Sequence, residues 1–143
     1  MPFKRILIAV DGSEISTYAA RLGLALAASI EAKVALLHVI GPTVADSSWY
    51  PVASGELMQP HDEEVAQVFA GLGGSAPIPE DAEKLIGAGP PGTAILQAAR
   101  DWSADLVVLG SHGREGLERA LFGSIAEEVA RQAPCPVLVV PQQ

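Results

Sequence analysis

Four residues in the last third of the chain have the types and the spacing of an anion-binding loop. Gly110 and Gly113 are three residues apart, and Gly123 follows ten residues later with Ser124 directly after it. Glycine lets a ligand approach the backbone closely, and a Gly-Ser pair that opens a helix presents N–H groups and a hydroxyl to a phosphate. The spacing matches neither G-x-G-x-x-G nor G-x-x-x-x-G-K-[ST]. The pattern predicts a two-piece phosphate cradle, although tight turns alone would use the same glycines.

Further polar residues accompany the apolar runs of the sequence. Asp11 directly follows the first run, where it can contact a ligand or cap the next helix. His112 lies in the glycine-rich loop, where it can shape the loop or act as a phosphoryl acceptor or general acid. His38 lies in a buried run and is expected to be a hydrogen-bonded core residue. The three histidines lack the spacing of metal ligands, so we predict no metal site in the protein.

Composition excludes several classes of function. The chain has 143 residues, of which 49% are hydrophobic, and a formal net charge of −8. This length suits one domain, over residues 1–143, with a sizeable core. No basic stripe is visible, so we expect neither nucleic-acid binding nor attachment to an anionic membrane. The first apolar run is too short for a secretion signal or a membrane span, and the single Cys135 fits a cytoplasmic protein.

Several apolar runs lack polar alternation, which is typical of strands buried on both faces of a parallel sheet. They cover residues 5–10, 33–40, 105–110 and 136–140, and residues 84–87 are the best candidate for a fifth, shorter strand. Because sequential strands of a parallel sheet need crossover connections, we expect a helix between them.

Helical patterns lie between the runs. Ser13 is the candidate N-cap of a pattern over residues 15–30, and similar apolar faces occur in residues 92–102 and 125–133. Residues 62–72 form a weaker candidate within a proline-rich middle segment. Alternating strands and helices predict a parallel sheet with helices on both faces, and such sheets bind ligands beyond the carboxyl ends of their strands.

Together these segments resemble the universal stress protein family. The family's ATP-binding signature, G-x2-G-x9-G-[ST], is filled by Gly110, Gly113, Gly123 and Ser124. Other segments also resemble the family: ILIAVDGSE at the start, LLHVI in the second run, ADLVVLGSHGR before the loop and APCPVLVVP near the end. Several separated motifs in the same order extend the resemblance over nearly the whole chain.

The resemblance implies a fold, a ligand and an assembly. The fold is a single-domain, Rossmann-like α/β domain of the adenine nucleotide alpha hydrolase-like type, with five parallel strands in the order 3-2-1-4-5. The ligand is ATP, AMP or another adenine nucleotide, with Mg²⁺. The family implies a stress-response or regulatory protein that forms a homodimer through strand Val137–Val140 and acts on a regulatory protein partner.

The resemblance also assigns the residues of the nucleotide site. Asp11 would contact the ribose or the adenine, within a frame made by the backbone around Ala9, Val10 and Val39. The sugar side would be lined by Leu109 and Gly110. The phosphates would be held by Gly113, Gly123, Ser124 and Ile125, with His112 and Arg114 beside them.

Charge in the loop leaves alternatives open. Glu115 and Glu118 would repel a triphosphate unless they point outward or share a Mg²⁺, although Arg114 offsets part of this charge. No lysine lies in or after the loop and no general base is evident, which favours binding over fast phosphoryl transfer. The alternatives are a slow ATPase or other phosphoryl-transfer enzyme and a nucleotide-free dimeric scaffold.

Overall fold

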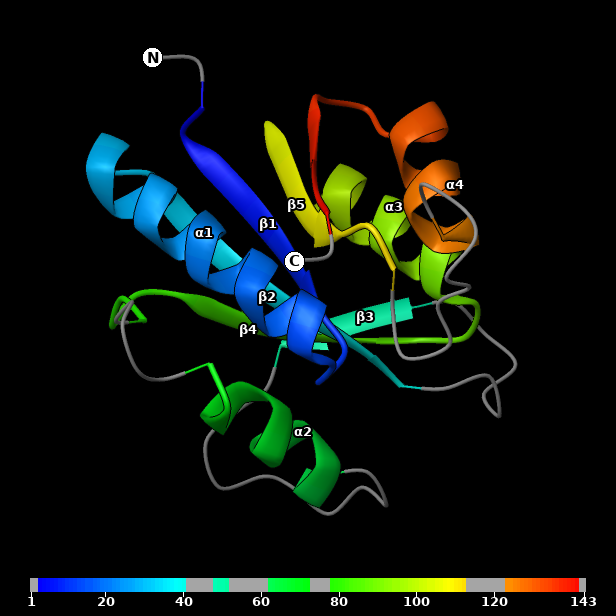
Figure 1. Cartoon of the computed structure of the whole chain (residues 1–143), viewed down its shortest axis with the longest axis horizontal. Helices are drawn as coiled ribbons and strands as arrows, with labels where there is room; N and C mark the ends of the chain where they lie inside the picture. The colour runs from blue at the N-terminus through cyan, green and yellow to red at the C-terminus, as the bar shows by residue number, and fades with distance from the viewer. Residues whose placement is uncertain (1–2, 41–47, 52–61, 73–77, 113–122, 142–143) are drawn as a thin grey trace.

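The computed structural model describes residues 3–40, 48–51, 62–72, 78–112 and 123–141. Its centre is a six-stranded sheet in the order β3-β4-β2-β1-β5-β6 (Figure 1). The strands are β1 Arg5–Val10, β2 Lys33–Ile40, β3 Ser48–Pro51, β4 Glu83–Ala88, β5 Leu106–Gly110 and β6 Val137–Val140. The helices are α1 Glu14–Ile30, α2 Asp62–Ala70, α3 Pro91–Asp101 and α4 Ser124–Gln132.

Five of these strands are parallel and confirm the expected strand order. Counted along the chain without β3, they run 3-2-1-4-5, with β1 between β2 and β5. The sequence did not predict β3, which pairs antiparallel with β4 and places Trp49 opposite Gly87. Pro51 argued against a strand in this segment, and the edge of a sheet is the place where a strand tolerates proline.

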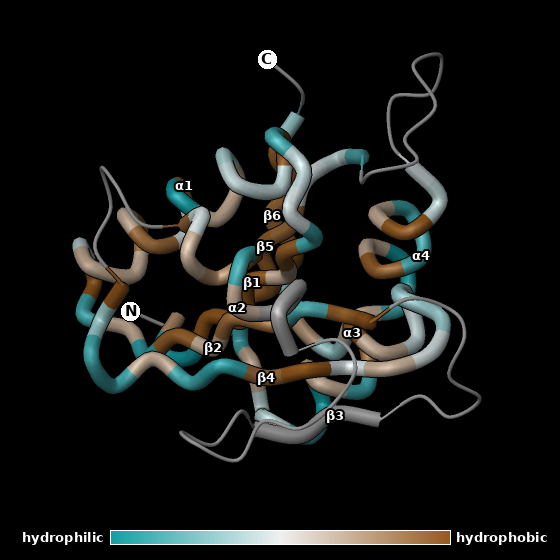
Figure 2. Tube along the Cα trace, turned by 90° about the horizontal axis from the view of Figure 1, so that it is seen from below, coloured by the Kyte–Doolittle hydropathy of each residue, from teal (hydrophilic) through white to brown (hydrophobic). Residues whose placement is uncertain are grey.

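Side-chain alternation along β1 separates two apolar layers. Ile6, Ile8 and Val10 pack in the layer that contains α1 and α2, whereas Leu7 packs in the layer that contains α3 and α4. Figure 2 shows the hydrophobic strands between α1 on one side and α3 and α4 on the other. The predicted helices on both faces are therefore confirmed. No helix in the described ranges has both the length and the apolar character to cross a membrane.

Local sequence signals set the ends of α1. Ser13 has extended backbone and its side chain accepts the N–H of Ser16, which confirms the predicted N-cap. Glu31 ends the helix in the left-handed conformation, with φ 57°, and its N–H donates to the Ala27 carbonyl. Because β1 ends at Val10 and α1 begins at Glu14, the N-terminus of α1 lies at the carboxyl end of β1. This is the edge where parallel sheets bind ligands.

Polar contacts join the elements at the opposite, amino-terminal edge. The Asp105 carboxylate accepts the backbone N–H groups of Lys4 and Arg5 at 2.8 and 2.9 Å. The Arg5 guanidinium lies 4.1 Å from the centroid of the Trp102 ring, and its Nε–H donates to the Trp102 carbonyl. The Trp102 indole N–H donates to the Glu83 carboxylate at 2.5 Å. These contacts hold the starts of β1 and β4 against the C-terminal end of α3.

Candidate functional site

The candidate site lies at the carboxyl ends of two neighbouring strands, from which the chain continues to opposite faces of the sheet. β1 continues into α1, which packs on one face of the sheet, and β5 leads to α4, which packs on the other face. β1 and β5 are paired side by side (Figure 1). Open parallel sheets bind ligands at such a reversal of strand order. The residues of interest are therefore those of the β1–α1 loop, the end of β5 and the start of α4.

The loop between β1 and α1 is closed on itself by hydrogen bonds. The Asp11 N–H donates to Ser16 Oγ, and the Ser13 N–H donates to Asp11 Oδ1, both at 2.9 Å. The Ser16 N–H donates to Ser13 Oγ at 3.2 Å, and the Thr17 hydroxyl donates to the Ser13 carbonyl at 2.9 Å. Gly12 makes the turn with φ 86°, a conformation that favours glycine. The half-buried Asp11 carboxylate is thus held beside the first turn of α1.

The segment after β5 is anchored by one buried serine. Ser111 is 1% exposed, and its N–H donates to the Val140 carbonyl at 2.8 Å. Its own carbonyl accepts the Gly123 N–H at 2.6 Å. Its hydroxyl lies 3.1 Å from His112 Nδ1. Ser111 therefore joins the end of β6, the start of α4 and the His112 ring at one point.

Helix α4 begins on a glycine, which has no side chain to cap it. Gly123 is the N-cap, with φ −71° and ψ 165°, and it has no side chain that could accept a hydrogen bond. The N–H groups of Ser124, Ile125 and Ala126 therefore face out of the helix end, where the helix dipole is positive. A Cβ added at Gly123 would lie 3.2 Å from the Ser111 oxygen, so glycine also permits this close approach. Ser124 is exposed and adds a hydroxyl.

Aliphatic side chains lie at the same edge, on the face that α3 and α4 cover. Ala9 and Val39 are half-buried near the ends of β1 and β2, and Leu109 is buried near the end of β5. Ile125 adds a half-buried side chain from the first turn of α4. This aliphatic surface (Ala9, Val39, Leu109 and Ile125) can pack against a flat ring, while the adjacent helix start accepts an anion.

The structure brings most of the predicted site residues to this one edge. The ends of β1, β2 and β5, or the residues just after them, hold Ala9, Val10, Asp11, Val39, Leu109, Gly110 and His112. The start of α4 holds Gly123, Ser124 and Ile125. Gly113 and Arg114 lie outside the described residues. The Gly123 N–H was expected to face phosphate, but it donates to Ser111 instead. Gly123 therefore contributes its position and its lack of a side chain.

Two serines of the site were not predicted from the sequence. Ser16 accepts the Asp11 N–H, and its signal is the S-x-x-S spacing from Ser13, which resembles a capping box. Ser111 carried no such signal, because a serine directly after a strand is usually exposed. Its burial follows from contacts with β6 and α4, which are distant in the sequence.

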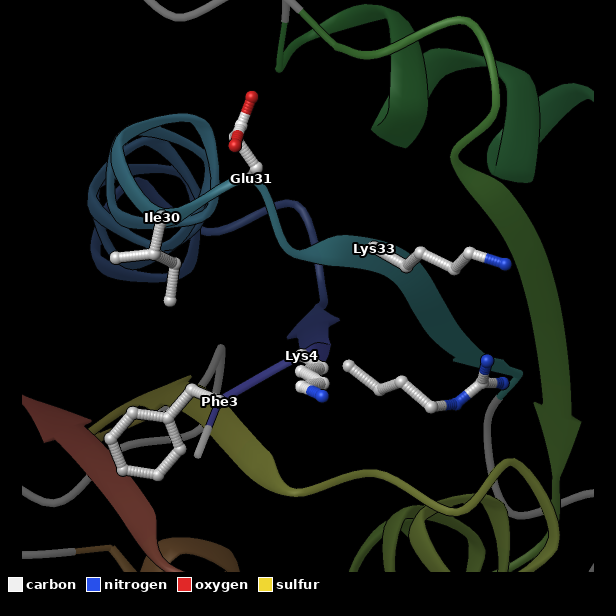
Figure 3. Close-up of a pocket in the computed structure, with 6 residues that line it drawn as sticks. Phe3, Lys4, Ile30, Glu31 and Lys33 are labelled. Carbon is white, nitrogen blue, oxygen red and sulfur yellow. The ribbon is translucent and has the colours of Figure 1, made fainter. Parts of the chain in front are cut away.

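A separate depression lies at the amino-terminal edge of the sheet, away from these residues. It has a volume of about 590 Å³ and is lined by Phe3, Lys4, Arg5, Ile30, Glu31 and Lys33. Figure 3 shows that Lys33 and Glu31 point away from each other and from Phe3. Since these side chains diverge, they do not form a matched set of ligand contacts. Within the described ranges, no group of His, Cys, Asp and Glu side chains could hold a metal ion.

Comparisons with known proteins agree with the resemblance in the sequence. The sequence profile of the universal stress protein family matches residues 2–141. A universal stress protein of Methanocaldococcus jannaschii is 35% identical over an alignment 143 positions long, which covers 96% of this chain and 82% of that protein.

Solved structures of the family share the fold. A universal stress protein in complex with cAMP superposes with a TM-score of 0.71 at 24% identity, covering 98% of each chain. A universal stress protein of Archaeoglobus fulgidus in complex with dAMP gives a TM-score of 0.62 at 20% identity, covering 98% of this chain and 99% of the other. The match of the family profile to nearly the full length decides the assignment: the chain belongs to the universal stress protein family.

Proposed function

We propose that this protein is a cytoplasmic regulatory protein that binds ATP with Mg²⁺, or AMP or another adenine nucleotide, at the carboxyl edge of its sheet. The observation that carries the proposal is the glycine-started N-terminus of α4 beside the aliphatic surface. Phosphate oxygens accept hydrogen bonds from the N–H groups of Ser124, Ile125 and Ala126. Adenine packs on the aliphatic surface, and the Asp11 carboxylate accepts from a ribose hydroxyl.

Related proteins support an adenine nucleotide as the ligand. The two family structures described above hold cAMP and dAMP, which share an adenine base and a phosphate group. The edge of the sheet offers separate chemistry for each of these parts: an apolar surface for the base and a helix N-terminus for the phosphate. A ligand with both parts would bind more tightly than inorganic phosphate or adenosine alone.

The chemistry of the cradle favours binding over turnover. Backbone N–H groups hold a phosphate but cannot exchange protons with it during a reaction. Fast phosphoryl transfer also needs strong charge neutralisation and a positioned base, and the last lysine of the chain is Lys84, in β4. We therefore propose that the nucleotide acts as a ligand that changes the dimer or the binding of a regulatory protein partner.

The direct test is the nucleotide content and the nucleotide response of the purified protein. Mass spectrometry of the denatured supernatant would identify any adenine nucleotide that copurifies. Millimolar Mg·ATP is expected to raise the melting temperature by linkage, and Gly123→Val is expected to abolish this rise. The absence of both a copurified nucleotide and a melting shift in the wild-type protein would overturn the proposal. Release of ADP, followed in the same samples, would reveal hydrolysis.

We also propose a homodimer paired through β6. In the described part of the chain, β6 pairs with β5 alone, and an open apolar edge strand is a site for strand pairing. Leu138 is 40% exposed and lies two residues before Val140, so both side chains are on the side of the sheet that carries α1. Leu22 of α1 is also 40% exposed. Light scattering should report a dimer for the wild type and a monomer for Leu138→Lys. A monomeric wild type would contradict this assembly.

A further inference from the structure

His38 is buried directly behind the β1–α1 loop, and it binds that loop through a backbone carbonyl. It lies in β2 opposite Val10 and is 2% exposed. Its Nδ1 is 3.0 Å from the Val10 carbonyl oxygen. A carbonyl oxygen can only accept a hydrogen bond, so Nδ1 must carry a proton and donate it. The ring is therefore a donor to the last carbonyl of β1.

That carbonyl belongs to the peptide unit that precedes Asp11. A peptide unit is planar, so its C=O and its N–H turn together. The C=O is held by His38, and the N–H, which belongs to Asp11, donates to Ser16 Oγ at 2.9 Å. Side chains from two different elements, β2 and α1, thus fix both ends of one peptide plane. The orientation of this plane decides where the Asp11 side chain leaves the backbone.

His38 is on the wrong side of the sheet to contact the proposed ligand itself. Side chains alternate along a strand, and Leu36 and Ile40 of β2 pack in the layer that contains α1. His38 lies between them in the sequence and shares their side. Val39, which belongs to the aliphatic surface, points to the opposite side. The hydrogen bond to the Val10 carbonyl therefore connects His38 to the site through the Val10–Asp11 peptide.

We infer that His38 is a positioning residue of the nucleotide site, which holds the Val10–Asp11 peptide so that Asp11 faces the ligand. This inference rests on the proposed function, because it assigns to Asp11 a contact with the nucleotide. In a purely structural role, only the volume of the His38 ring would matter for nucleotide binding. In the positioning role, binding also depends on the hydrogen bond donated from the position of Nδ1.

Variants at position 38 separate these two roles. His38→Asn places an amide N–H near the position of Nδ1, whereas His38→Leu fills a similar space with no donor. We expect His38→Leu to weaken Mg·ATP binding in calorimetry by roughly five- to tenfold, the effect of one lost hydrogen bond, and His38→Asn to retain most of the affinity. Leu36→Val, in the same strand and on the same side, is the control for core damage and should bind as the wild type does.

A second readout does not depend on the nucleotide. Hydrogen exchange of the Asp11 amide, measured by NMR in the ligand-free protein, should be about tenfold faster in His38→Leu than in the wild type and nearly unchanged in His38→Asn. If His38→Leu does not fold, His38→Gln replaces it, because its amide group lies near the position of Nε2 and not of Nδ1.

The outcomes decide the inference and the proposed function separately. A wild type that binds no nucleotide overturns the proposed function, and the exchange measurement then decides alone whether His38 holds the peptide. A wild type that binds, together with a His38→Leu variant of equal affinity, overturns the inference and leaves the proposed function intact. Equal losses of affinity in His38→Leu and His38→Asn, with no change in Asp11 exchange, would also overturn it.

Discussion

Helices α1 and α4 begin at the carboxyl ends of neighbouring strands, but their first turns are opposite in character. α1 is capped by its own sequence, because Ser13 Oγ accepts the Ser16 N–H and Asp11 Oδ1 accepts the Ser13 N–H. α4 starts on Gly123, which has no side chain to offer. A helix start that is already capped has fewer N–H groups left for a ligand. The difference supports our proposal that phosphate binds at the start of α4, while the α1 loop presents a fixed carboxylate.

A third helix start is intermediate: the N-cap of α3, Pro90, makes no side-chain capping hydrogen bond, but a carboxylate from another helix lies beside it. The Glu128 carboxylate of α4 packs against Gly92 in the first turn of α3, so closely that a Cβ on Gly92 would lie 2.1 Å from Glu128 Oε1. A carboxylate is the kind of group that a helix N-terminus attracts. The protein thus places its own oxygen atoms at the starts of α1 and α3. At the start of α4, the N-cap Gly123 makes no side-chain capping hydrogen bond.

The largest expected effect comes from making α4 resemble α1. Gly123→Asp supplies a capping carboxylate that competes with phosphate for the same N–H groups and repels it. We expect Mg·ATP affinity in calorimetry to fall by at least about 100-fold, since several charge-assisted hydrogen bonds are lost. Gly123→Ala is the matched control, because its Cβ meets the same Ser111 oxygen at 3.2 Å without adding an acceptor. Equal affinities of the two variants would contradict this reading of the helix start.

The next effect concerns the other half of the site. Asp11→Ala removes the carboxylate that we propose to contact the sugar, and it leaves the start of α4 unchanged. We expect Mg·ATP affinity to fall by roughly tenfold, the effect of one hydrogen bond to a charged group. Binding of inorganic tripolyphosphate, measured in the same way, should not change. A parallel loss for both ligands would mean that Asp11 acts on the whole edge and not on the nucleoside.

A smaller effect is expected on stability alone. Ser13→Ala removes the N-cap of α1 and should lower the free energy of unfolding by about 1 kcal/mol. Urea denaturation followed by circular dichroism measures this change. Ser13→Thr retains a hydroxyl acceptor and should recover most of the loss. If Ser13→Ala is as stable as the wild type, the capping bonds of α1 contribute little, and the contrast with α4 is weaker than the geometry indicates.

The smallest effect concerns Cys135, at the opposite end of the molecule from the site. Burial, and to a lesser extent the nearby Asp105 carboxylate, raises the pKa of the Cys135 thiol above its ordinary value. Less thiolate is therefore present at neutral pH than for a free cysteine. Alkylation by iodoacetamide at pH 7.5 should be slower than that of glutathione and should not change with Mg·ATP. Strong protection by the nucleotide would place a ligand near the start of β6, away from the candidate site.

The parallel sheet could be predicted from the sequence because its signals are local and strong. Unbroken apolar runs marked the buried strands, and the pattern over residues 15–30 with Ser13 before it marked α1. β3 could not be predicted, since it has only four residues and ends in Pro51, although Trp49 and Tyr50 favour a strand. These four residues form a strand because β4 offers a free edge beside them, and that pairing depends on residues far away in the sequence.

The candidate site, like the fold, could be predicted only in part from the sequence. The glycine spacing indicated the start of α4, and the residue after the first run indicated Asp11. The contacts that hold these residues were not predictable, because they join distant segments. Ser111 accepts the N–H of Gly123 and donates to Val140, and His38 donates to Val10. Sequence patterns thus indicated the residues that we propose to contact the ligand, whereas the residues that position them were found only in the tertiary structure.

The most direct test of the contrast between the two helix starts is an amide map of binding. Mg·ATP is titrated into ¹⁵N-labelled protein, and backbone chemical shifts are followed residue by residue. We predict saturable shifts for the amides of Ser124, Ile125 and Ala126 and for Asp11. Inorganic tripolyphosphate should move the α4 amides alone, and Glu31 and Lys33 at the amino-terminal edge should not respond to either ligand. Shifts confined to that edge, or saturation by Mg·ATP that leaves the first turn of α4 unmoved, would contradict the account.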